Sequence, residues 1–181
     1  WIMIIATALA TVFQGLTIPY NGSERTVQYG YGDQKELLKW VKSMGNSQKY
    51  PLIWYVLNDF TELNGKYETE ARLVIMQNTE SEWFNKTRQS ESYTKIIDPL
   101  TKLVKKRLTE NLHVEIMSRE LKDRFKEKDE PNYGVDTNNE NLTSSDFKST
   151  KTYADVGIVT DIVDARLLRF GLRINAECLI N

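Results

Sequence analysis

Carboxylates are the residues of this sequence that could most readily take part in chemistry. One pair is Asp161 with Asp164, and a second group contains Glu127, Asp129 and Glu130. Neighbouring carboxylates can bind a divalent cation, or they can act as acid and base on either side of a reacting bond. The same residues are typical of a turn before a strand and of a solvated run of charges, and we favour this structural interpretation.

Metal-assisted catalysis is the least favoured hypothesis for this chain. The acids near its long polar segment follow no recognised metal-binding spacing. These acids are Asp146, Asp155, Asp161 and Asp164. His113 is the only histidine and Cys178 the only cysteine. A zinc site with several histidines or cysteines and an internal disulfide are therefore excluded. Glycine-rich phosphate-binding motifs do not occur. We predict a protein without catalytic activity, cofactor or metal.

The composition is that of an ordinary globular protein. The chain has 181 residues, of which 40% are hydrophobic and 27% charged, and its formal net charge is −1. This length suits one domain with a sizeable core, so we expect residues 1–181 to form a single domain. A net charge so close to zero gives no support to specific nucleic-acid binding.

The C-terminal segment has the clearest period of the sequence. From Leu168 to Ile180, apolar residues alternate with polar residues or glycine, as expected for a strand with one buried and one exposed face. The apolar row is Leu168, Phe170, Leu172, Ile174, Ala176, Cys178 and Ile180. The other row is Arg169, Gly171, Arg173, Asn175 and Glu177. We expect the sheet to be organised around this strand.

Arg169 and Arg173 lie in the polar row with one residue of that row between them, and two interpretations of them stay open. They are solvated or paired with acids on an adjacent strand, or they face a neighbouring subunit and bind its carboxylates. A polar segment from Pro131 to Thr152 has the composition of a long loop that contacts a partner. The interface candidates are Arg169, Arg173, Asp136, Asn141, Asp146 and Lys148.

The remaining elements follow from hydrophobic period and capping residues. Apolar residues recur at helical spacing from Ile2 to Leu16, which favours a buried helix over a targeting segment. We expect a turn around Asn21, and a helix capped by Asp33 and Glu36. The other expected elements are strands at Thr26–Tyr31, Tyr50–Leu57, Tyr67–Gln77 and His113–Met117, and a helical region from a capping box at Thr79–Glu82 to Asn111, interrupted at Pro99.

Together these elements predict an α+β fold with a small, mostly antiparallel sheet flanked by helices and one long polar loop before the last strand. We expect a hairpin between two consecutive predicted strands, Tyr50–Leu57 and Tyr67–Gln77. Tyr50–Leu57 is apolar on both faces and is expected to lie inside the sheet.

Three stretches resemble the tail terminator (tail-completion) proteins at the head–tail junction of tailed bacteriophages. They are Y-P-L-I-W-Y-V at Tyr50–Val56, Trp83 with Y-T-K-I-I-D-P-L at Tyr93–Leu100, and D-I-V-D-A-R-L-L-R-F-G-L-R-I at Asp161–Ile174. The resemblance implies a structural virion protein of the tail or neck, made in the host cytoplasm. It also implies a homo-oligomeric ring, typically a hexamer, that joins the tail tube to the neck or connector and through which the genome can pass. The alternative is a non-catalytic α+β binding module of a membrane-associated or secretion assembly.

Overall fold

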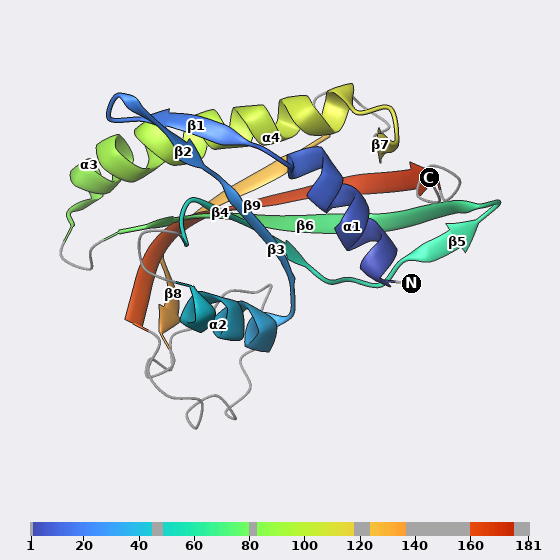
Figure 1. Cartoon of the computed structure of the whole chain (residues 1–181), viewed down its shortest axis with the longest axis horizontal. Coiled ribbons are helices and arrows are strands. Elements are labelled where there is room, and N and C mark those ends of the chain that lie inside the picture. Colours follow the sequence, from blue (N-terminus) through green and yellow to red (C-terminus); the bar gives the residue numbers. More distant parts are fainter. Residues whose placement is uncertain (1, 45–48, 80–82, 118–123, 137–159, 176–181) are drawn as a thin grey trace.

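The computed structural model describes residues 2–44, 49–79, 83–117, 124–136 and 160–175 (Figure 1). Its helices are α1 (Ile2–Phe13), α2 (Gln34–Ser43), α3 (Asn85–Thr87), the π-helical segment η2 (Arg88–Ile97) and α4 (Asp98–Glu110). Its strands are β1 (Thr17–Tyr20), β2 (Ser23–Thr26), β3 (Gln28–Gly32), β4 (Leu52–Val56), β5 (Thr61–Leu63), β6 (Lys66–Asn78), β7 (Val114–Met117), β8 (Lys126–Asp136) and β9 (Thr160–Asn175).

The α+β fold is confirmed, and the sheet is larger than expected. Seven strands form the main sheet, in which β3, β4, β6, β9 and β7 follow one another, β5 pairs with β6, and β8 pairs with β9. Only the pairing of β3 with β4 is parallel, so the sheet is mostly antiparallel as predicted. Strands β1 and β2 form a separate two-stranded sheet.

The pairing of β6 with β9 forms the centre of the sheet. It runs from Lys66 opposite Asn175 to Asn78 opposite Val163, over all 13 residues of β6. The outer edge of β6 carries β4 and β5, and the outer edge of β9 carries β7 and β8. The C-terminal strand is therefore central, as its period predicted, and it begins earlier than expected, at Thr160.

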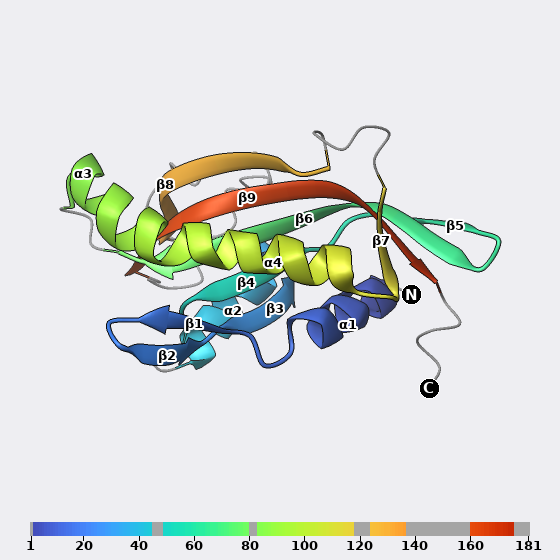
Figure 2. The same ribbon diagram turned by 90° about the horizontal axis from the view of Figure 1, so that it is seen from above.

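Helices cover the two faces of this sheet to different extents. α1, η2 and α4 pack on one face together with the β1–β2 sheet, and α2 packs on the opposite face (Figures 1 and 2). The predicted apolar row of β9 is confirmed, because four of its residues are buried on the face that α4 covers: Leu168, Phe170, Leu172 and Ile174. The last three members of that row, Ala176, Cys178 and Ile180, lie outside the described residues.

The N-terminal helix α1 is part of the core, as predicted. Its apolar stripe is buried over Ile5, Leu9, Val12 and Phe13. The Tyr29 hydroxyl on β3 donates a hydrogen bond to the Ala6 carbonyl at 2.9 Å, which ties the helix to the sheet edge. Within the described part of the chain, no helix is both long and apolar enough to cross a membrane.

Two further predictions about local structure are confirmed. Asp33 and Glu36 form a reciprocal capping box at the start of α2, in which each side chain accepts a backbone N–H, at 2.9 and 2.8 Å. All five residues of β4 are buried, because helices lie over both faces of this strand.

Gly30 of β3 lies against the Trp54 ring, and a Cβ there would come within 2.5 Å of Trp54 Cζ3.

The predicted turn around Asn21 is confirmed, with positive φ angles of 48° at Asn21 and 79° at Gly22, and it closes a hairpin of β1 and β2 that was not predicted. Two other expectations are wrong in their boundaries. The helical region begins at Asn85 and not at the capping box predicted from Thr79, of which Glu82 lies outside the described residues. The predicted loop from Pro131 starts as strand, because β8 continues to Asp136 by pairing with β9; its remainder, 137–152, lies outside the described residues.

The interruption predicted at Pro99 takes the form of a change in helix type. Asp98 N–H bonds to the Tyr93 carbonyl, five residues back, so the turns before the proline are π-helical. Pro99 then occupies the first turn of α4, where a missing N–H costs least. The helix therefore continues through the proline from Asn85 to Glu110, and π-helical turns of this kind are often found at functional sites.

Leu172→Asp should abolish folding, because it places a carboxylate in a fully buried row and removes core contacts at a cost of several kcal/mol. Phe84→Asp is the control at an exposed apolar site, since that phenylalanine is 83% exposed. Circular dichroism and thermal melting check both variants. A Leu172→Asp protein that melts like wild type would show that the assignment of the two faces of β9 is wrong.

The free energy of unfolding should fall as the pH rises above about 10. Burial raises the pKa of the Tyr55 hydroxyl to about 12, and burial also raises the pKa values of Tyr29 and Tyr93. The folded state therefore holds these protons more tightly than the unfolded state, which ionises first. Tyr55→Phe should make the alkaline fall shallower in urea titrations. Equal slopes in the two proteins above pH 10 would contradict the role of Tyr55.

Candidate interaction site at the end of the sheet

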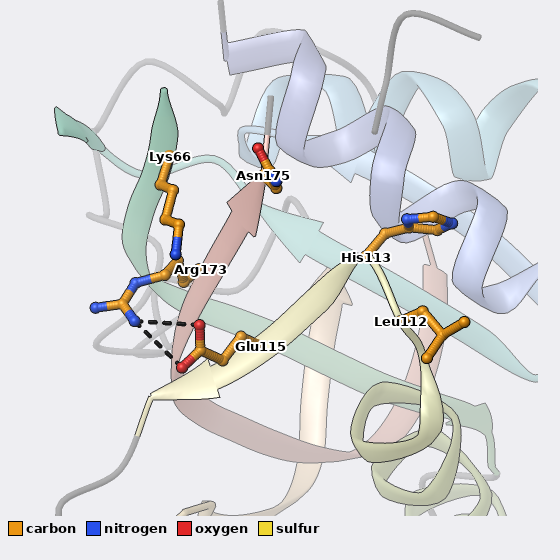
Figure 3. A pocket seen from close by; sticks show the side chains of 6 residues that line it. All are labelled: Lys66, Leu112, His113, Glu115, Arg173 and Asn175. Carbon is orange, nitrogen blue, oxygen red and sulfur yellow. Dashed lines mark hydrogen bonds and ion pairs between the residues drawn. The ribbon is translucent and has the colours of Figure 1, made fainter. Parts of the chain in front are cut away.

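Arg173 is the residue around which one end of the sheet is arranged. It lies on β9 between two neighbours in register, Glu68 of β6 and Glu115 of β7. Its Nε donates to Glu68 Oε1 at 2.6 Å, and its Nη1 donates to the Glu115 oxygens at 3.2 and 3.1 Å (Figure 3). These hydrogen bonds to Glu68 and Glu115 raise the pKa of Arg173.

A pocket of about 190 Å³ adjoins this arginine. Side chains from three strands and the turn after α4 line it: Lys66, Leu112, His113, Glu115, Arg173 and Asn175 (Figure 3). Lys66 and Arg173 bring positive charge to one side of the pocket. His113, expected in a short strand, immediately precedes β7 and is exposed. The pocket is polar and open, which suits contact with a protein surface.

The interpretation of Arg173 as a residue paired with acids on adjacent strands matches this geometry. Arg169, four positions earlier in the chain, is half-buried on the same face opposite Arg72 of β6. Of the loop candidates, Asp136 pairs with Thr160 in the β8–β9 ladder. Asn141, Asp146 and Lys148 lie outside the described residues. Among the interface candidates, Arg169 and Arg173 thus share one face of β9, four positions apart along the strand.

A second polar cluster, which was not predicted from the sequence, lies under η2 at the other end of β9. The Arg88 guanidinium is 3% exposed and donates to the fully buried Asp164 carboxylate at 2.5 Å. Arg88 also donates to Thr79 Oγ1 at 3.2 Å and to the Trp83 carbonyl at 3.1 Å. One arginine therefore fixes the segment between β6 and α3, the start of η2 and the first half of β9.

Arg166 extends this cluster along β9. It donates to both carboxylate oxygens of Asp129 on β8, at 2.6 and 3.0 Å, and to Asp98 at the start of α4 at 2.7 Å. Its guanidinium also lies 5.8 Å from the centre of the Tyr93 ring. Burial lowers the pKa of Arg166, but the hydrogen bonds to Asp129 and Asp98 outweigh burial and leave that pKa raised. Two planar arginines thus fasten the helix to the sheet.

A signal for this cluster is present in the sequence. Asp164 and Arg166 continue the apolar row of β9 backwards at a spacing of two, so they belong to the buried face. Arg88 and Ser92 continue the stripe of Ile96 backwards at a spacing of four, so they also face inwards. Charges on two stripes that should be buried indicate a buried ion pair.

Four of the acids considered for metal binding form ion pairs with cationic side chains. Asp164 pairs with Arg88, Asp129 with Arg166, and Glu127 with Lys105. Glu130 pairs with Lys128, and Asp146 and Asp155 lie outside the described residues. Within the described ranges, no group of three histidine, cysteine, aspartate or glutamate side chains is placed to hold a metal ion.

Comparisons with known proteins assign no family. No family model matches the chain, and no significant similarity was found to a curated protein or to a solved structure. Function must therefore be inferred from the contacts and surfaces of the chain itself.

Arg88→Met should lower the free energy of unfolding by about 3–5 kcal/mol, because it leaves the buried Asp164 carboxylate without its arginine. The double variant Arg88→Met, Asp164→Leu should recover most of this loss, since it buries no charge. Lys95→Met is the control on the same helix, where loss of the exposed pair with Glu91 should cost about 0.5 kcal/mol or less. Urea unfolding of wild type and the three variants measures these differences. A double variant no more stable than Arg88→Met would show that the loss does not come from the unpaired Asp164 carboxylate.

Proposed function

We propose that this protein is a structural subunit of a homo-oligomeric ring in the tail or neck of a tailed-phage virion. It acts through contacts with identical copies, the tail tube and the neck or connector. By its resemblance to tail terminators, the ring is a hexamer that leaves a central passage for the genome. Its role is to join two parts of the particle, and it involves no catalysis.

One observation carries this proposal: within the described residues, no helix covers the sheet face opposite α4 at the end where β5 and β7 lie. α2 covers only the other end of that face, where it packs on Trp54, Val74 and Leu167. Towards β5 and β7, Glu70 and Glu115 are exposed, and α2 is the described helix that packs on this face, at its other end. This end of the face is therefore open among the described residues and suits contacts between subunits.

The chemistry of this face supports contact and not catalysis. Glu68, Glu115 and Arg173 form a cross-strand group in which every charge has an opposite partner. Exposed charge pairs of this kind add little to stability, but they give direction and specificity to association. A face that is charged at its rim and structured by its own ion pairs suits a repeated interface between copies.

The purified protein should sediment as one oligomer several times heavier than its 21.0 kDa protomer, and negative-stain images should show closed rings. Sedimentation velocity over a wide concentration range tests the first point. A monomer at every concentration, with no ring in any native particle, would reject the ring and favour the binding-module alternative. An open filament would reject ring closure.

A further inference from the structure

Two surfaces of the described residues have an excess of one charge among side chains without an ion pair. On the outer side of α4, Lys102, Lys106 and Arg107 are exposed and form no ion pair within the described part of the chain. Near the β5–β6 hairpin, the exposed carboxylates of Asp59, Glu62 and Glu70 likewise form no ion pair among the described residues. One exposed charge of opposite sign accompanies each group: Glu110 lines the hollow beside Lys106 and Arg107, and Lys66 lies in the β5–β6 hairpin. The first group is therefore net positive and the second net negative.

Each group borders a hollow with an apolar component. On the basic side, a hollow of about 460 Å³ lies between α1 and α4, and Val12 and Leu103 contribute apolar surface beside Lys106 and Arg107. On the acidic side, a hollow of about 350 Å³ contains Phe60 and Met117. Asp59, Glu68 and Glu70 line this second hollow. Both surfaces thus combine a charged rim with apolar contact area, as protein interfaces do.

Leu112 lies in the turn after α4, between the basic side of that helix and the pocket beside Arg173. It follows α4 directly and is 95% exposed, one of two large apolar side chains exposed in the described part of the chain. The other, Phe84, is 83% exposed and precedes α3 at the far end of the same helix (Figure 2). Met117 gives the acidic hollow apolar surface for a leucine side chain. Phe60 also lines the hollow, and its ring packs edge-on against Tyr67, which belongs to the core on the α4 face.

The two surfaces lie on opposite faces of the sheet. Glu70 and Met117 are in register with Gly171 of β9, on the face that α2 covers farther along. α4 packs on the other face. One neighbour cannot satisfy both surfaces of a copy at once, so the contact must repeat from copy to copy in one direction. Such a head-to-tail contact closes into a ring when its rotation permits.

We propose that the basic side of one copy docks on the acidic hollow of the next copy. Lys106 and Arg107 face the carboxylates of Asp59 and Glu70, and Leu112 enters the hollow lined by Phe60 and Met117. This contact rests on the proposed ring and identifies the two surfaces that form it. Charge complementarity selects a second copy of the chain as the occupant of both surfaces.

Charge reversal on each side provides the main test. Lys106→Glu with Arg107→Glu makes both surfaces acidic, and Asp59→Lys with Glu70→Lys makes both basic. Each double variant alone should associate at least about tenfold more weakly than wild type. An equimolar mixture of the two should associate again, because every contact then joins opposite charges. The control is Lys39→Glu with Lys86→Glu, which changes the same net charge at exposed sites on α2 and α3.

Sedimentation velocity measures association, and circular dichroism checks that each variant is folded. Leu112→Ser should weaken association in the same way, whereas Phe84→Ser should leave it unchanged. These two single changes also test the contact if a charge variant does not fold. Wild-type association that survives both double variants, or a mixture that stays dissociated, would overturn the proposed contact while the ring itself stands.

Two further outcomes would also reject this contact. A wild-type protein that is monomeric throughout would reject the ring, and the contact would fail with it. If Lys106→Glu with Arg107→Glu abolishes binding to a mixed-sequence DNA duplex but leaves self-association unchanged, the basic side binds a polyanion and the proposed contact is wrong.

Discussion

The antiparallel pairing of β6 with β9 is the constraint on which the rest of the structure depends. It joins Lys66 to Asn175 and Asn78 to Val163, residues far apart in the chain. Every other strand of the main sheet reaches the centre through one of these two strands, except β3, which pairs with β4. The loop between the two partners must close before the sheet exists, so formation of this pairing is costly in chain entropy. All helix packing that uses the sheet as its base follows from it.

The composition of these two strands also determines which surface stays open. At the end of the sheet where α2 lies, the residues on the face opposite α4 are apolar. Val74, Met76, Ala165 and Leu167 pack there with α2. Towards the other end, the same face carries Glu68, Glu70, Arg169 and Arg173. Met117 of β7 adds only a small apolar area there, and no described helix packs on it, so this end of the sheet keeps a mainly charged face. The change from apolar to charged residues within two strands thus separates a core from a surface.

Strong periodicity was sufficient to predict the elements that have one apolar side. The four buried residues of β9 from Leu168, the stripe of α1 and the capping box of α2 were all recognisable in the sequence. β8 was missed because it is an edge strand, and its charged residues from Lys126 show no apolar alternation. The Arg88–Asp164 pair joins residues 76 positions apart. The pattern of apolar residues can therefore indicate that both charges are buried, but it cannot indicate that they contact each other.

The buried arginines have a consequence for ring formation. A helix held on a sheet only by apolar contacts can shift along it at small cost, since such contacts have little directional preference. Arg88 and Arg166 instead fix η2 and the start of α4 to β9 and β8 by hydrogen bonds of defined direction. The basic side of α4 and the acidic hollow near Met117 therefore keep a constant relative orientation. A closed ring of identical subunits requires a constant rotation from one copy to the next, and a variable rotation would give rings of mixed order or open filaments. In the proposed assembly, the polar interactions buried in each subunit are thus what allows its two outer surfaces to define one ring.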